Sequence, residues 1–179
     1  MPPSTISPLP VGSIAPDFTL IDVISGQPAK LGVLLGAGAV LDFWSVDCPW
    51  SRHYDDYFLE RAELWAAQGV MLIMIACNAG ETIEQMRDMA DAYGITNPIL
   101  SDAGGRIADA YGAQTTPHVF VLDGTGQVIY QGAVDDRTFR QPEPTINYLD
   151  AAVEALIAGQ RPAIGDTPAY GCQIVRQGL

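Results

Sequence analysis

Two apolar segments, residues 39–44 and 70–77, constrain the fold more than any other part of this chain. Each has the length of a strand and is almost uniformly hydrophobic, as expected of strands that are covered on both faces of a sheet. Residues 49–68, between them, carry apolar side chains at helical spacing, begin at a proline and are followed by Gly69. We expect the strand, helix and strand to form a right-handed crossover with the two strands parallel.

The rest of the chain continues this alternation and then changes to a hairpin. Asp-Gly-Thr-Gly at residues 123–126 lies between two apolar segments and is a strong hairpin signal. The further strands are expected at residues 17–21, 99–101, 119–122 and 127–130, and the further helices at residues 30–36, 81–93, 105–111 and 145–158. The sequence therefore predicts an α/β fold in which helices cover both faces of a mixed central sheet.

The two ends of the chain differ in composition from this central part. Residues 1–12 are rich in proline and are expected to form an extended N-terminal arm. Residues 13–159 would form the folded domain, and residues 160–179 a C-terminal tail rich in proline and glycine. A chain of 179 residues, 48% of them hydrophobic, is long enough for one such domain with a real core.

The charge balance excludes some classes of partner. Nine basic and 21 acidic residues leave a net charge of −12, which argues against binding to nucleic acid or to anionic lipid. No segment has the pattern of a signal peptide or of a membrane span. Three distant cysteines are neither a disulfide framework nor a metal set. We therefore expect a cytoplasmic protein with reduced thiols, no metal and no cofactor.

Cys48 is the candidate nucleophile, because it joins the first buried strand to the helix that begins at Pro49. At a helix N-terminus, the dipole and the free N–H groups stabilise a thiolate and lower the pKa of a thiol from its usual value of about 8.5. The alternative is an inert thiol on the same scaffold. Cys77 lies in the second apolar segment and is expected to be a core residue.

Three motifs resemble known families. Val-Leu-Asp-Phe-Trp at residues 40–44, at a fixed distance before Cys48, resembles the segment that leads into the redox centre of thioredoxin. Residues 15–20 and 126–132 resemble the alkyl hydroperoxide reductase/thiol-specific antioxidant (AhpC/TSA, redoxin) superfamily. Thr-Thr-Pro at residues 115–117, ahead of an apolar strand, resembles the segment that holds the cis-proline of thioredoxin-fold proteins.

The resemblance covers about residues 12–158 and implies a thioredoxin-like fold with thiol chemistry. It implies that Pro117 is cis, faces Cys48 and leaves the backbone of Thr116 free to pair with an extended substrate. Asp42 matches the buried acid of thioredoxin and would assist proton transfer as a general base, unless it reaches solvent. The residues expected to line the substrate site are Trp50, Pro49, Ser45 and His118.

One departure from thioredoxin bears directly on the mechanism. Ser51 stands where thioredoxin has its second cysteine, and a hydroxyl can hydrogen-bond a thiolate but cannot attack a mixed disulfide. We therefore expect a centre with a single nucleophilic cysteine, released from the mixed disulfide by an outside thiol or by Cys172. The prolines and glycines of the tail would let Cys172 fold back to the site.

The sequence thus predicts a thiol-disulfide oxidoreductase or antioxidant protein that acts on a disulfide- or thiol-containing protein or on a low-molecular-weight thiol. A thiol peroxidase is one alternative, since peroxiredoxins also have a Ser or Thr at the position of Ser45, three residues before Cys48. However, Leu41 and Pro117 replace the proline and the arginine of that family. A binding module that grips extended chains without turnover is the other alternative. The substrate, the electron donor and the oligomeric state stay open.

Overall fold

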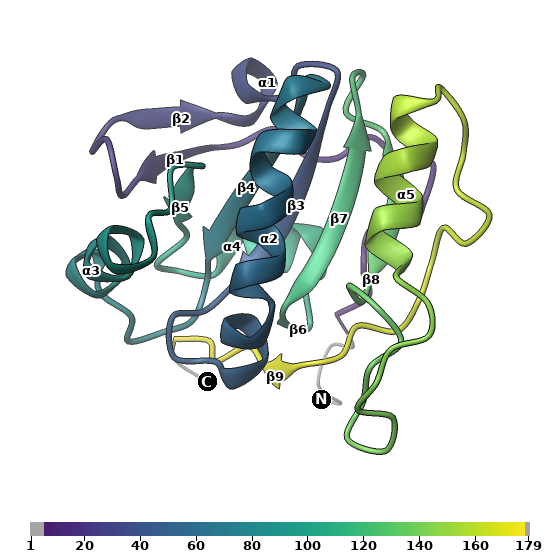
Figure 1. Cartoon of the computed structure of the whole chain (residues 1–179). Helices are drawn as coiled ribbons and strands as arrows, with labels where there is room; N and C mark the ends of the chain where they lie inside the picture. Colours follow the sequence, from purple (N-terminus) through teal and green to yellow (C-terminus); the bar gives the residue numbers. More distant parts are fainter. Residues whose placement is uncertain (1–5, 178–179) are drawn as a thin grey trace, which may run out of the picture.

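The computed structural model describes residues 6–177 and confirms the predicted fold class (Figure 1). The main sheet has seven strands in the order β2-β1-β5-β4-β3-β7-β8. Their bounds are β1 Thr19–Asp22, β2 Pro28–Lys30, β3 Gly38–Trp44, β4 Val70–Ala76, β5 Ile99–Ser101, β7 His118–Asp123 and β8 Val128–Gly132. The sequence predicts all of these except β2, which begins two residues before the helix expected at residues 30–36.

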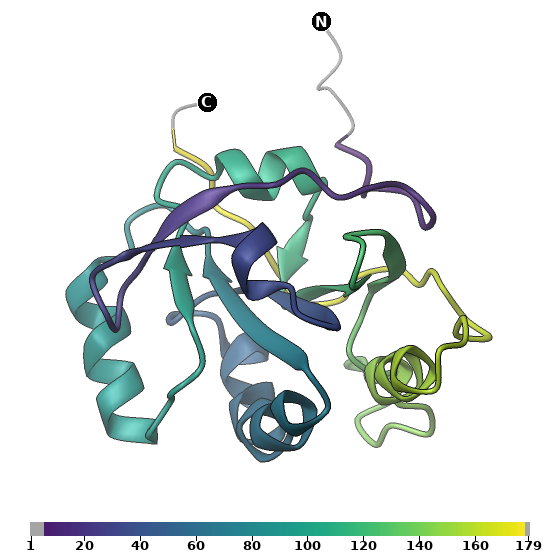
Figure 2. The same cartoon turned by 90° about the horizontal axis from the view of Figure 1, so that it is seen from above.

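Helices cover both faces of this sheet, as Figure 2 shows. On one face lie α2 (Pro49–Ala67), α3 (Ile83–Tyr93) and α5 (Tyr148–Ile157), and on the other lie the short helices α1 (Leu31–Leu34) and α4 (Arg106–Tyr111). No helix among residues 6–177 is long and apolar enough to cross a membrane.

The centre of the core is β3, which pairs with β4 in parallel and with β7 antiparallel. Because successive side chains of a strand point to opposite faces, β3 supplies both layers of the core. Leu41 and Phe43 pack in the cluster that contains Tyr111 of α4, whereas Val40 and Trp44 pack in the clusters beneath α2 and α3. All seven residues of β3 are buried, so the strand gives rigid support to the loop and helix at its C-terminal end.

Both ends of the described chain pack against the central part. The N–H groups of Leu9 and Gly12 donate to carbonyls of α4 and β8, at 2.9 Å and 2.8 Å. In the tail, Thr167 donates its N–H to the Gln131 carbonyl of β8 at 3.1 Å. The tail then crosses the molecule and forms a second, two-stranded sheet, in which β9 (Cys172–Gln173) pairs with β6 (Thr115–Thr116) (Figure 1). The predicted boundaries of the arm, domain and tail stay predictions.

Candidate redox site

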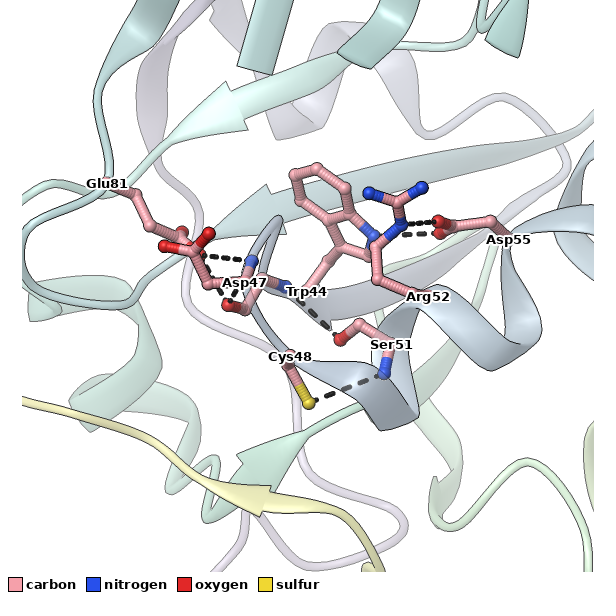
Figure 3. Close-up of polar contacts among 8 residues, drawn as sticks. Trp44, Asp47, Cys48, Ser51, Arg52, Asp55 and Glu81 are labelled. Carbon is pink, nitrogen blue, oxygen red and sulfur yellow. Dashed lines mark hydrogen bonds and ion pairs between the residues drawn. The ribbon is translucent and has the colours of Figure 1, made fainter. Parts of the chain in front are cut away.

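Cys48 lies at the junction of β3 and α2, where the sequence predicts it. It is the N-cap residue of α2, and its Sγ accepts a hydrogen bond from the Ser51 N–H at 3.4 Å (Figure 3). Pro49 begins the helix, at the position where a missing N–H leaves no hydrogen bond unmade. The sulfur therefore faces the positive end of a 19-residue helix, an environment that stabilises a thiolate.

Cys48 forms a disulfide with Cys172. The two residues are 124 positions apart in the sequence, and their Cα atoms are 6.2 Å apart, within the usual range for a disulfide. The centre therefore has two cysteines, and the expected single-cysteine centre is not confirmed. The third cysteine, Cys77, is free and buried, and burial raises the pKa of its thiol far above the usual range.

The Thr116–Pro117 peptide bond is cis, as the resemblance implies. The Cys48 Sγ lies 3.0 Å from the Thr116 carbonyl oxygen, so this segment faces the disulfide. The Thr116 backbone is not free, however, because β9 of the tail pairs antiparallel with it: Thr116 lies opposite Cys172 and Thr115 opposite Gln173. The edge expected to receive a substrate strand is occupied by the protein's own tail.

The hydroxyl groups of the two serines predicted at the site bond to the surrounding loop and not to the Cys48 sulfur. The Ser51 hydroxyl accepts a hydrogen bond from the Ser45 N–H at 3.2 Å, so the backbone of Ser51, and not its hydroxyl, contacts Cys48. The Ser45 hydroxyl donates to Glu81 and accepts from the Asn78 side chain at 2.9 Å. No sequence pattern marks Glu81 as a member of the site, and burial raises the pKa of its carboxyl.

Asp42 is buried on the same face of β3 as Trp44, beneath α2. Neither of its carboxylate oxygens has a hydrogen-bond partner among the described residues. Burial raises the pKa of Asp42 well above the usual range, and the nearby charge of Asp55 raises it further. Asp55 itself accepts hydrogen bonds from Trp44 Nε1 at 3.0 Å and Arg52 Nε at 2.6 Å (Figure 3). Asp42 is thus a buried acid whose protonated form is favoured by its surroundings.

His118 is buried in β7, and both of its ring nitrogens have partners there. Nδ1 accepts from the Gln114 N–H at 3.1 Å, so the neutral ring donates from Nε2 to the Gln131 side chain at 2.9 Å. Burial lowers the pKa of His118 to about 4, which leaves the ring uncharged at neutral pH. The structure therefore assigns His118 to the core, because neither nitrogen is available to a substrate.

An apolar pocket of about 410 Å³ opens beside the disulfide and is lined by Pro49, Trp50, His53, Phe139 and Cys172. The Trp50 ring packs edge-on against Phe139, with ring centroids 5.3 Å apart. The sequence predicts Pro49 and Trp50 for such a wall. Phe139 is missed, because it lies in an irregular loop with no pattern that marks it.

Comparisons with known proteins agree with this geometry. Residues 11–131 match the AhpC/TSA family. The thiol-disulfide oxidoreductase ResA of Geobacillus thermodenitrificans (strain NG80-2) is 34% identical over 118 residues, which are 66% of this chain and 66% of that protein. The match thus spans just under two thirds of this relative.

Two solved structures show a similar fold. A hypothetical protein from Sinorhizobium meliloti 1021 is similar over 97% of this chain and 98% of its own, with a TM-score of 0.88 and 28% identity. The thioredoxin domain of a thiol-disulfide oxidoreductase from Bacteroides vulgatus has a TM-score of 0.62 at 20% identity, over 75% of this chain and 93% of that domain. The second likeness shows the thioredoxin-like fold alone. With its fold, its cis-proline and the match over residues 11–131, this chain belongs to the AhpC/TSA family.

Proposed function

We propose that the protein is a thiol-disulfide oxidoreductase whose centre cycles between the Cys48–Cys172 disulfide and the two free thiols. The disulfide itself is the observation that carries this proposal. In each cycle the disulfide gains two electrons and two protons as a dithiol partner is oxidised, and the reverse reaction reduces a partner disulfide. The family and the name of the ResA relative support this reaction class.

Cys172 supplies the function that the chain lacks at Ser51. A hydroxyl next to Cys48 cannot resolve a mixed disulfide, whereas a second sulfur held at bonding distance can. Opposite Thr116, β9 holds Cys172 in that place. The protein thus forms its dithiol pair from two segments that are distant in sequence.

The chemistry of the site fits a partner that carries a thiol or a disulfide, either another protein or a low-molecular-weight thiol. The apolar pocket beside Cys172 favours partners with uncharged groups next to their sulfur. The cytoplasmic location and the antioxidant role stay predictions, and the oligomeric state stays open.

The test is the reduction of insulin disulfides with dithiothreitol as electron donor. We expect the Cys48→Ser and the Cys172→Ser variants each to lose at least about 100-fold in rate, because either change removes one sulfur of the pair. Cys77→Ala is the matched control and should keep the rate, since Cys77 is a free, buried thiol that takes no part in the disulfide.

Two outcomes would contradict the proposal. Full activity of Cys172→Ser would show that Cys48 acts without Cys172, as in the single-cysteine mechanism expected from the sequence. Peroxide consumption far faster than that of free cysteine, without insulin reduction, would favour the peroxidase alternative.

A further inference from the structure

We infer that outside thiols and disulfides exchange with Cys172, and that Cys48 exchanges only with Cys172. This inference rests on the proposed function and assigns the order in which the two sulfurs act. It reverses the order expected from the sequence, in which Cys48 meets the outside partner and Cys172 resolves.

The first observation is a difference in access. Cys48 is 3% exposed, and its sulfur is enclosed by the Thr116 carbonyl at 3.0 Å and the Ser51 N–H at 3.4 Å. Cys172 is partly exposed. Because thiol-disulfide exchange requires the attacking sulfur to reach its target, the accessible sulfur of a disulfide is the one attacked.

The second observation is the path that leads to Cys172. Cys172 lines the apolar pocket together with Pro49, Trp50, His53 and Phe139, whereas Cys48 does not line it. Phe139 is 82% exposed, so the pocket opens to solvent. A partner that enters it meets Cys172 first.

The third observation concerns the leaving group. When an outside thiolate bonds to the Cys172 Sγ, the bond to Cys48 breaks and Cys48 takes the electron pair as a thiolate. That thiolate forms at the N-terminus of α2, where the Ser51 N–H already points at the sulfur. A thiol of lower pKa leaves faster, so attack on Cys172 also uses the better leaving group.

The remaining steps balance without a further reagent. A second thiolate of the partner attacks the partner's own sulfur in the mixed disulfide, and Cys172 leaves as a thiolate that takes up a proton. By microscopic reversibility, in the opposite direction the Cys172 thiolate attacks the partner disulfide, and Cys48 then attacks the Cys172 Sγ and releases the partner.

Contacts that do not involve either sulfur keep Cys172 in place throughout. After it, Ile174 is buried with 3% exposure, the Val175 N–H donates to the Asn78 side chain at 2.8 Å, and Arg176 pairs with Asp109. Because none of these contacts involves a sulfur atom, we expect Cys172 to be the accessible sulfur in the reduced protein as well.

The test uses the oxidised protein and 2-mercaptoethanol, a small neutral thiol. Samples are quenched with acid at successive times, their free thiols are alkylated with N-ethylmaleimide, and peptides are mapped by mass spectrometry. At the earliest times we expect at least about tenfold more 2-mercaptoethanol on Cys172 than on Cys48, with the alkyl group on Cys48. Cys77 is an internal control: it is a free thiol, so it holds no disulfide for 2-mercaptoethanol to attack, and its burial keeps it from exchanging with the mixed disulfide. It should carry 2-mercaptoethanol at no time point.

Equal labelling of the two cysteines, or more 2-mercaptoethanol on Cys48, would overturn the inference. Its failure differs from a failure of the proposed function. If the map of the oxidised protein, before any thiol is added, shows Cys48 and Cys172 as separate peptides, the pair itself is wrong.

Discussion

The two halves of the disulfide are held in place by different means. Cys48 lies between a strand that is buried at all seven positions and a 19-residue helix. Cys172 lies in a two-residue strand, and the flanking tail is fixed by contacts of individual residues, among them Thr167 before it, and Ile174 and Arg176 after it. Regular secondary structure positions one sulfur, and a series of separate tertiary contacts positions the other. The second half can therefore be weakened contact by contact while the first stays intact.

Removal of the bond between the halves should have the largest effect on stability. Cys172→Ser removes the bond that closes a loop of 124 residues. The unfolded chain then gains conformational entropy, which predicts a decrease of about 5 kcal/mol in the free energy of unfolding. Urea denaturation of the oxidised protein and of the variant measures the difference. Reduced wild-type protein should match the variant, and unequal values would show that the serine disturbs the site in some other way.

Ile174→Ala should have the next largest effect, because it removes the apolar anchor of the tail. Ile174 is 3% exposed in the cluster that contains Leu41 and Phe43, and such a truncation costs about 2–4 kcal/mol. Val175→Ala is the matched control, since Val175 is 57% exposed and should change stability by less than about 0.5 kcal/mol. Similar losses in both variants would mean that the tail does not depend on Ile174.

Asp42→Asn tests the half that contains Cys48. The pKa of Asp42 is raised in the folded protein, so its contribution to stability is present below the unfolded pKa of about 3.9 and is lost as the pH rises through the folded pKa. The asparagine does not ionise. The stability of the variant relative to wild type should therefore increase with pH across that window, by about 1.4 kcal/mol for each pH unit between the two pKa values.

The measurement is urea denaturation at a series of pH values from about 4 to 9. Only the difference between the two proteins is interpreted, because other buried acids, including Asp55 and Glu81, also have raised pKa values. Parallel curves for variant and wild type would contradict the assignment of Asp42 as an unpaired buried acid.

Gly171→Ala should shift Cys172 away from its position opposite Thr116 without changing either cysteine. A Cβ at Gly171 would lie closer to the Thr116 carbonyl oxygen than any allowed contact between these atoms. Strand β9 must therefore shift. We expect the effective concentration of the Cys172 thiol at Cys48 to fall at least about tenfold, which is about 1.4 kcal/mol. Equilibration of the protein with reduced and oxidised glutathione measures this effective concentration. Gly104→Ala, where a Cβ meets nothing within 4 Å, should leave the value unchanged.

Arg176→Ala should have the smallest effect of the series. Arg176 pairs with Asp109 at 2.6 Å near the surface, and such pairs contribute about 0.2–1 kcal/mol. Hydrogen exchange of the tail amides in the reduced protein should become up to about fivefold faster. Arg140→Ala, in an exposed loop, is the charge-matched control. A larger change than in Ile174→Ala would reverse the assumed order of the tail contacts.

The same contrast explains how much could be predicted from the sequence. The half that contains Cys48 depends on local patterns: the apolar run of β3, Pro49 at the start of α2 and Gly69 after its end are all visible in the chain. The cis peptide at Pro117 is implied by the resemblance and is confirmed. Each of these features has a fixed spacing or a fixed residue type, so it can be recognised in one sequence without a structure.

For the half that contains Cys172, the sequence identifies the cysteine but does not predict where it lies. Its position depends on the close contact between Gly171 and Thr116 and on the packing of Ile174 in a core that is distant in sequence. Neither contact produces a periodic pattern in the sequence. A two-residue strand such as β9 is too short to show alternation. His118 is a related case, because only the folded structure shows that it is buried and that both of its ring nitrogens bond to Gln114 and Gln131.

The separation of the two cysteines also has a consequence for synthesis. Cys172 comes 124 residues after Cys48, and a ribosome that adds about 5–20 residues per second delivers it roughly 6–25 s later. Throughout that interval the nascent chain carries Cys48 without the sulfur that completes its centre. The disulfide can form only after translation has passed residue 172. If the proposed two-cysteine mechanism holds, a product truncated before that residue would lack redox activity even with β3 and α2 intact.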